Sequence, residues 1–144
     1  MTLNHKIWLP HLKFILQTIS VSYPTHPNDV TIKKYYEFIQ NLPVFVPMEP
    51  FGDNFLKMLD EFPVTPYLSS RLSFMKWVNF IFNKINKQLG LETENFHDSL
   101  EKYYESYKPE DLKKKELYKK REKYVKLGFL LISFSTIVYF YNKY

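Results

Sequence analysis

Apolar residues recur at intervals of three or four along most of the chain, and this spacing is typical of helices with one buried face. The pattern predicts helices over residues 7–23, 28–42, about 47–60, 70–90 and 93–107. No stretch alternates between apolar and polar residues as a half-buried strand would, and no internal repeat is present. The sequence therefore predicts an all-α protein built as a bundle of four or five helices.

Capping residues, proline and glycine give the predicted helix boundaries. Asn28 or Asp29 caps the second helix, and Pro47 starts the third. Gly90 ends the fourth helix, because glycine readily adopts the left-handed conformation that closes a helix. The fifth is predicted to begin at Thr93–Phe96, a capping box that lacks its acidic residue.

A sixth helix is predicted after residue 108. Pro109, Glu110 and Asp111 suit a helix start, because proline fits the first turn and acidic side chains complement the dipole there. Nothing breaks the helix before about Tyr141. The predicted organisation is a helical bundle over 1–108, a basic stalk helix over 109–126 and a transmembrane anchor over 127–144.

The segment Leu127–Tyr141 is the candidate membrane span. It holds fifteen residues without a charge, fewer than the roughly 20 that cross a bilayer. Tyr139 and Tyr141 can lie at the headgroup level and Lys126 can snorkel, which lengthens the span in effect. A buried core helix or an interfacial helix would be the alternatives, but an all-round apolar segment behind a basic run favours a span.

The net charge of +5 lies entirely in the last part of the chain. Residues 1–108 carry 11 basic and 11 acidic residues, whereas residues 109–144 carry 9 basic and 4 acidic ones. Eight of those basic residues precede the span and one follows it, so the positive-inside rule predicts a cytoplasmic N-terminal domain. The N-terminus lacks the apolar region of a signal peptide, so we expect a single-pass C-terminal anchor.

The basic stalk has three interpretations. It can hold anionic lipid headgroups, grip nucleic-acid phosphates, or simply be a solvated helix face. No base-reading motif supports nucleic acid. The membrane-surface interpretation assigns the headgroup contacts to five residues near the span: Lys119, Lys120, Arg121, Lys123 and Lys126.

Cysteine is absent, which excludes disulfides, thiolate nucleophiles and thiolate metal sites. The four histidines are scattered without ligand spacing, so we expect no metal site.

Five stretches carry a family resemblance by their order and spacing. They are WLP (8–10), LQTISVSYP (16–24), FVPMEPFGDNF (45–55), FPVTPYLSSR (62–71) and FMKWVNFIFNKINKQLGL (74–91). Together they resemble the Erv/ALR family of FAD-linked sulfhydryl oxidases, especially the short forms of large DNA viruses. The resemblance covers about residues 8–107 and implies the helical bundle of that family.

Departures from the family pattern fall on the chemistry. The redox cysteine pair maps to Met48 and Phe51, neither of which can become a thiolate. The positions matching cofactor contacts of the family are, by the resemblance, Lys13, Gln17, Phe82, Asn83, Asn86 and Leu91, of which only Asn83 and Asn86 keep the family's residue. The resemblance therefore implies a degenerate, cysteine-less member with no catalytic residues and no bound FAD expected.

We expect a non-catalytic, membrane-anchored structural protein, a minor virion or capsid-associated component that tethers the capsid shell to an inner or host-derived membrane. One alternative is an FAD-binding or partner-binding accessory of a viral disulfide-forming pathway, and a second is a tail-anchored cellular adaptor. Expected partners are membrane lipid and capsid or other virion proteins, not nucleic acid, and the resemblance implies that a homo-oligomer can form. Met48 and Phe51 are predicted to pack side by side near Phe82.

Overall fold

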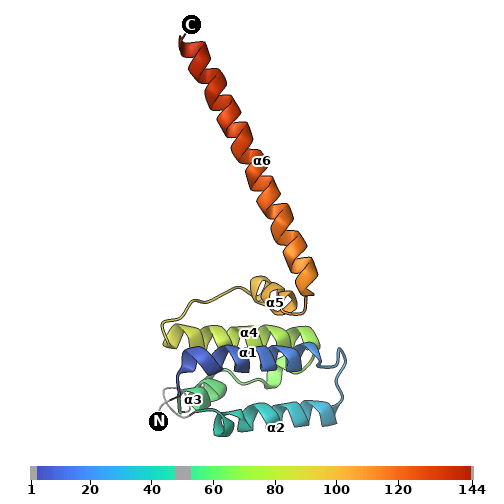
Figure 1. Cartoon of the computed structure of the whole chain (residues 1–144). Helices are drawn as coiled ribbons and strands as arrows, with labels where there is room; N and C mark the ends of the chain where they lie inside the picture. Colours follow the sequence, from blue (N-terminus) through green and yellow to red (C-terminus); the bar gives the residue numbers. More distant parts are fainter. Residues whose placement is uncertain (1–2, 48–52, 144) are drawn as a thin grey trace. The chain divides into compact units, whose positions relative to one another are not determined.

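The computed structural model describes residues 3–47 and 53–143, and all of its regular elements are helices (Figure 1). This confirms the predicted all-α class. The helices are α1 (His5–Val21), α2 (Asp29–Phe45), α3 (Asp53–Glu61), the short 3₁₀ helix η2 (Thr65–Tyr67), α4 (Arg71–Gln88), α5 (Phe96–Glu105) and α6 (Glu110–Lys143). Contacts divide the chain into two compact units, Met1–Tyr103 and Tyr104–Tyr144.

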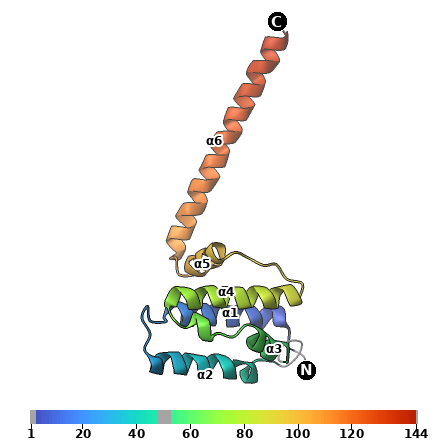
Figure 2. The ribbon, with the colours of Figure 1, turned by 180° about the vertical axis from the view of Figure 1, so that it is seen from behind.

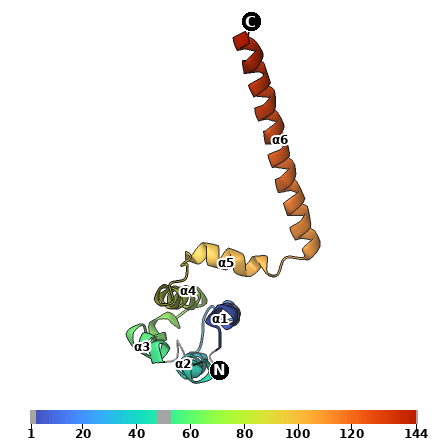
Figure 3. The ribbon, with the colours of Figure 1, turned by 60° about the vertical axis from the view of Figure 1, so that its left-hand side comes forward.

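The first unit is a bundle in which α1 packs against α4 and α2 packs against α3. Viewed nearly along the axes of α1, α2 and α4, these helices are seen end-on (Figure 3). In the view from behind, α1 lies between α4 and α2 (Figure 2). The pairing of α1 with α4 matters most for function, because most of the predicted cofactor positions lie on these two helices.

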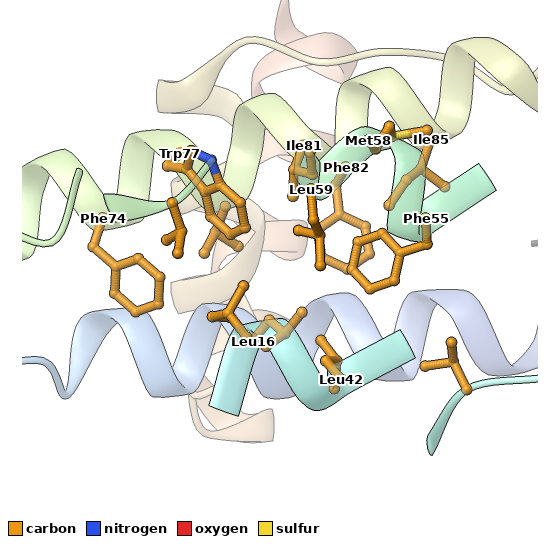
Figure 4. Close-up of a cluster of buried hydrophobic side chains, with 14 of the residues drawn as sticks. Leu16, Leu42, Phe55, Met58, Leu59, Phe74, Trp77, Ile81, Phe82 and Ile85 are labelled. Carbon is orange, nitrogen blue, oxygen red and sulfur yellow. The ribbon is translucent and has the colours of Figure 1, made fainter. Parts of the chain in front are cut away.

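The core of this unit is built around α4. Its buried face holds Phe74, Trp77, Val78, Ile81, Phe82 and Ile85. Leu16 from α1 and Phe55 and Leu59 from α3 point into the same core, each 1% exposed (Figure 4). Burying a side chain of this size contributes about 1.5–3 kcal/mol, so the bundle has a large apolar driving force of its own.

Two hydrogen bonds satisfy polar atoms within this core. The Trp77 indole donates to the Phe62 carbonyl at 3.1 Å, and the Tyr23 hydroxyl donates to the Leu68 carbonyl at 2.8 Å. Both acceptors lie in the segment between α3 and α4. The aromatic side chains therefore also fix the path of that connection.

Several predicted boundaries are confirmed at atomic detail. The Asn28 side chain accepts from the Thr31 amide at 2.8 Å, so Asn28 rather than Asp29 caps α2. Gly90 follows the end of α4 with φ of +65°, the left-handed conformation that glycine adopts without strain.

Other boundaries were predicted wrongly. Helix α2 does not end at residue 42 but continues through Pro43 to Phe45. Burial of the Pro43 ring offsets the backbone hydrogen bond that proline cannot donate. Pro47 is not helical, so it does not start the third helix, which spans Asp53–Glu61. Helix α5 begins at Phe96, where Asn95 rather than Thr93 accepts from the Asp98 amide at 2.9 Å.

The second unit consists largely of α6, a single helix of 34 residues and about 51 Å at 1.5 Å per residue. Lys108 precedes it and pairs with Glu105 at 2.5 Å and with Glu116 at 3.2 Å. Among the described residues, α6 is the one helix long and apolar enough to cross a membrane by length and composition, and none of its apolar window is buried.

Candidate functional site

Four of the six predicted cofactor positions line one cavity. Lys13 from α1, Phe82 and Asn86 from α4, and Leu91 after α4 surround a space of about 420 Å³. His5, Lys6, Leu9 and Pro10 complete its described lining. This volume lies within the usual range of small-molecule sites, about 300–1,000 Å³.

Lys13 is engaged by an acidic residue far along the chain. Its ammonium forms an ion pair with Glu94, and the two side chains are 17% and 18% exposed. Lys102 from α5 binds the other carboxylate oxygen of Glu94 at 2.5 Å. Glu94 therefore lies between two cations at the edge of the bundle.

The charge state of Glu94 follows from these contacts. Burial alone would raise the pKa of its carboxyl, but hydrogen bonds from Lys102 and Lys13 outweigh burial and hold the pKa below its ordinary value. Glu94 is therefore ionised at neutral pH and presents a full negative charge to Lys13.

Asn83 and Asn86 hold the connector between α4 and α5. The Asn83 amide donates to the Glu94 carbonyl at 2.7 Å, and its oxygen accepts from the Glu94 backbone amide at 3.1 Å. Asn86 donates to the Glu92 carbonyl at 2.8 Å. These side-chain amides replace the partners that an irregular backbone segment lacks.

Gln17 lies apart from that cavity. Its side-chain amide donates to the Ser99 hydroxyl at 3.0 Å and to the Ser99 carbonyl at 3.3 Å, which joins α1 to α5. The space beside this contact, which Asn79 and Phe96 also line, is only about 10 Å³. One water at most fits there, so this part of the predicted cofactor region is filled by protein.

Phe82 is 1% exposed and belongs to the core. Phe82 and Phe55 both point into the space between α4 and α1 (Figure 4). The positions that match the redox pair, Met48 and Phe51, lie outside the described residues, as does Gly52. The predicted contact of Met48 and Phe51 with Phe82 therefore stays a prediction.

The five predicted membrane-surface residues lie on α6, and all are exposed: Lys119, Lys120, Arg121, Lys123 and Lys126. Lys126 pairs with Glu122 one turn earlier at 2.6 Å. Tyr124 and Val125, which lie between Glu122 and Lys126, are 62% and 50% exposed, respectively. Apolar and basic side chains are thus both available along the helix just before Leu127.

In the part of the chain that the structure describes, no three His, Asp or Glu side chains lie close enough together to hold a metal ion.

Sequence reasoning missed Glu94, Ser99 and Lys102. Glu94 and Ser99 lie 81 and 82 residues from their α1 partners, Lys13 and Gln17. No local pattern marks a residue whose role depends on such a distant contact. The available signal was that Lys13 and Gln17 depart from the family pattern. A buried cation and a buried amide each need a polar partner, so partners elsewhere in the chain could have been expected.

Solved structures share this fold. The core of yeast Erv1 superposes with a TM-score of 0.63 at 19% identity, covering 72% of this chain and 86% of that one. The FAD binding domain of Erv1 from Saccharomyces cerevisiae does so with a TM-score of 0.63 at 20% identity, covering 70% and 94%. The protein therefore falls in the class of Erv1-like helical bundles.

The sequence model of the Erv1/Alr family matches residues 13–108, and the chain belongs to this family. Among curated proteins, it is similar to one named "Probable FAD-linked sulfhydryl oxidase" from Acanthamoeba polyphaga mimivirus. The two are 27% identical over 101 residues, which cover 69% of this chain and 68% of the relative. Because this chain contains no cysteine, the redox pair of a sulfhydryl oxidase is absent from it.

Proposed function

We propose that this protein is a non-catalytic, membrane-anchored structural protein on a sulfhydryl-oxidase scaffold, and that it tethers a viral capsid shell to a membrane as a minor virion component. The observation that carries the proposal is the absence of cysteine from a chain of a family whose relatives are named sulfhydryl oxidases. Thiol oxidation needs a thiolate to attack the substrate and carry the electrons onward. Methionine and phenylalanine at positions 48 and 51 can do neither.

The residues at the cofactor positions do not suit FAD. Lys13 and Gln17 are bound to Glu94 and Ser99, and Asn83 and Asn86 are bound to backbone of the connector. Phe82 is buried in the core, and the space beside Gln17 holds no more than about 10 Å³. A flavin would have to displace several of these internal contacts, so the scaffold is better suited to stand without it.

Anchoring rests on α6. None of its apolar window is buried, and such exposed apolar surface is costly in water and favourable in a bilayer. Eight basic residues before that part and one after it favour an orientation with the first unit in the cytoplasm. The five membrane-surface residues would each contribute about 1 kcal/mol near an anionic leaflet.

The tether role is supported by the architecture and by the viral relative. A folded bundle followed by a basic stalk and a membrane span can join a lipid surface to a protein layer. The mimivirus relative supports a source among large DNA viruses, whose shells would be the partner. Capsid or other virion proteins, membrane lipid and a second copy of the chain are the proposed partners, and nucleic acid is not.

The test is the location of the chain in purified particles of the virus that encodes it. We expect it to resist extraction by alkaline carbonate and to cross-link through lysines of residues 3–103 to a shell protein. An integral protein of the particle, used as a reference, should fractionate with it. Recovery in the soluble fraction, or cross-links to soluble redox proteins alone, would contradict the tether.

One observation favours a second candidate, an FAD-binding or partner-binding accessory of a disulfide-forming pathway. The 420 Å³ cavity is lined by four of the positions that match cofactor contacts of the family. Absorbance of the purified, detergent-solubilised chain in the flavin bands would support this accessory role. A colourless chain that fractionates with the shell would support the tether.

A further inference from the structure

Two lysines and a histidine gather at the 420 Å³ cavity. His5, Lys6 and Lys13 all lie on α1 and all contribute to its lining. None of the described lining residues is acidic. The first turn of α1 also lacks an acidic residue, so its partial positive charge adds to that of the side chains.

Among the described residues, the nearby charges leave the cavity with a positive excess. Glu94 offsets Lys13, but Lys102 binds the same carboxylate, so Lys13, Lys102 and Glu94 together keep a net positive charge. Within residues 3–47 and 53–143, Lys6 makes no ion pair. The Lys13 ammonium carries three donors, and its bond to Glu94 uses one of them.

The rest of the lining is apolar. Leu9 and Phe82 are 3% and 1% exposed and lie against the core, while Pro10 and Leu91 complete the wall. A ligand that removes this apolar surface from water is stabilised by the hydrophobic effect. Cations beside an apolar wall suit a ligand that is itself amphiphilic.

We propose that this cavity binds a small amphiphile with one acidic head group, a carboxylate or a phosphate monoester, and an apolar body. The acidic group would lie between Lys6 and Lys13, and the apolar body against Phe82 and Leu91. The ligand would bind the donors of Lys13 that Glu94 leaves free. This inference goes beyond the tether, since the cavity lies wholly within the first unit and its occupation requires neither α6 nor a capsid partner.

The test uses the whole chain in nanodiscs of phosphatidylcholine and two probes of equal shape. 2-Naphthoate carries the acidic group and 2-naphthamide does not. Calorimetric titration should show saturable binding of 2-naphthoate and at least tenfold weaker binding of the amide. Lys6→Gln should weaken 2-naphthoate binding about tenfold, whereas Lys76→Gln, which removes a lysine of α4 away from the cavity, should leave it unchanged.

A second variant guards against a loss that merely reflects altered charge or folding. Leu91→Trp fills the cavity from its apolar side and keeps His5, Lys6 and Lys13, so it should abolish binding while the melting temperature stays close to that of the parent. A further arm replaces part of the phosphatidylcholine by phosphatidate. If 2-naphthoate binds more weakly in the nanodiscs that contain phosphatidate, the lipid head group competes for the cavity and is the natural ligand. If its affinity is unchanged, the natural ligand is a free acid.

Four results would overturn the proposal. They are equal binding of the acid and the amide, equal affinity of the Lys6→Gln and Lys76→Gln variants, unchanged binding to Leu91→Trp, and no saturable binding at millimolar 2-naphthoate. Stoichiometric binding of FAD that displaces 2-naphthoate would also overturn it, because the cavity would then be a flavin site.

Discussion

Lys13 in the first helix is paired with Glu94 in the connector between α4 and α5, and this contact joins segments 81 residues apart. Lys102 binds the same carboxylate, and Asn83 binds both backbone polar groups of Glu94. By the family resemblance, Lys13 and Asn83 are two of the positions predicted to match cofactor contacts, and both of these side chains bind the chain itself.

Replacing the Glu94 carboxylate should lower stability. Glu94→Gln keeps the size of the side chain but removes its charge from between Lys13 and Lys102. The expected loss is about 1–2 kcal/mol in the free energy of unfolding, because the pair is only partly solvated. Urea unfolding in detergent measures it. The control is Glu92→Gln, an exposed residue of the same connector, which should change stability by less than about 0.5 kcal/mol.

The same carboxylate predicts a pH dependence. Because hydrogen bonds from Lys102 and Lys13 hold the folded-state pKa of Glu94 below its ordinary 4.5, its charge stabilises the fold above that value. This contribution should be lost as the pH falls through the lowered pKa of Glu94. The free energy of unfolding of the parent should therefore fall more steeply below pH 4.5 than that of Glu94→Gln. Parallel curves for the two proteins would show that Glu94 is not stabilised as an anion.

Asn83→Ala should release the connector. The change removes two hydrogen bonds, of 2.7 and 3.1 Å, from the Glu94 backbone. The Glu94 amide then loses this partner, and the Glu94 carbonyl keeps only the 3.5 Å hydrogen bond from Asn79. We expect a loss of about 1–3 kcal/mol and faster hydrogen exchange at the Glu94 amide. Asn41→Ala is the matched control, since Asn41 binds one carbonyl on the exposed surface of α2. An equal effect of both variants on Glu94 exchange would contradict a specific clamp.

Phe82→Ala should be strongly destabilising. Phe82 is 1% exposed in the core, and removing its ring leaves a cavity that the rigid helices cannot close. The expected loss is about 3–5 kcal/mol, measured by thermal or urea unfolding. Phe45→Ala removes a ring that is 80% exposed and should have little effect. A mild effect at Phe82 would contradict the role of its ring as a core-filling side chain.

Charges placed in the apolar part of α6 should prevent membrane insertion. Leu131→Lys with Ile132→Lys should cost about 2.5–3.5 kcal/mol for each lysine at the centre of a span. Leu117→Lys with Tyr118→Lys is the matched control, because these exposed residues lie about four turns earlier on the same face. Carbonate extraction should release the first variant and retain the second. Retention of both would show that Leu131 and Ile132 do not lie in hydrocarbon.

Much of the architecture was predictable because helix formation depends on local spacing. The periodicity of apolar residues predicted the helices, and local residue preferences were enough to identify Asn28 and Gly90 as boundary residues. The errors at Pro43, Pro47 and Thr93 have a common cause. Proline and capping residues have strong local preferences, but several candidates lie close together in the sequence. Packing decides which of them is used, as it does where Pro43 is buried within α2.

By itself, the sequence determined the all-α class, the family resemblance, the absence of thiol chemistry and a helix able to span a membrane. Each of these depends on residue type or short-range spacing. Only the tertiary structure decided that Lys13 pairs with Glu94, that Gln17 binds Ser99, and that two lysines of α1 line a largely apolar cavity. Such contacts join residues from helices distant in sequence, and their geometry is fixed only when the core has brought α1 against α4.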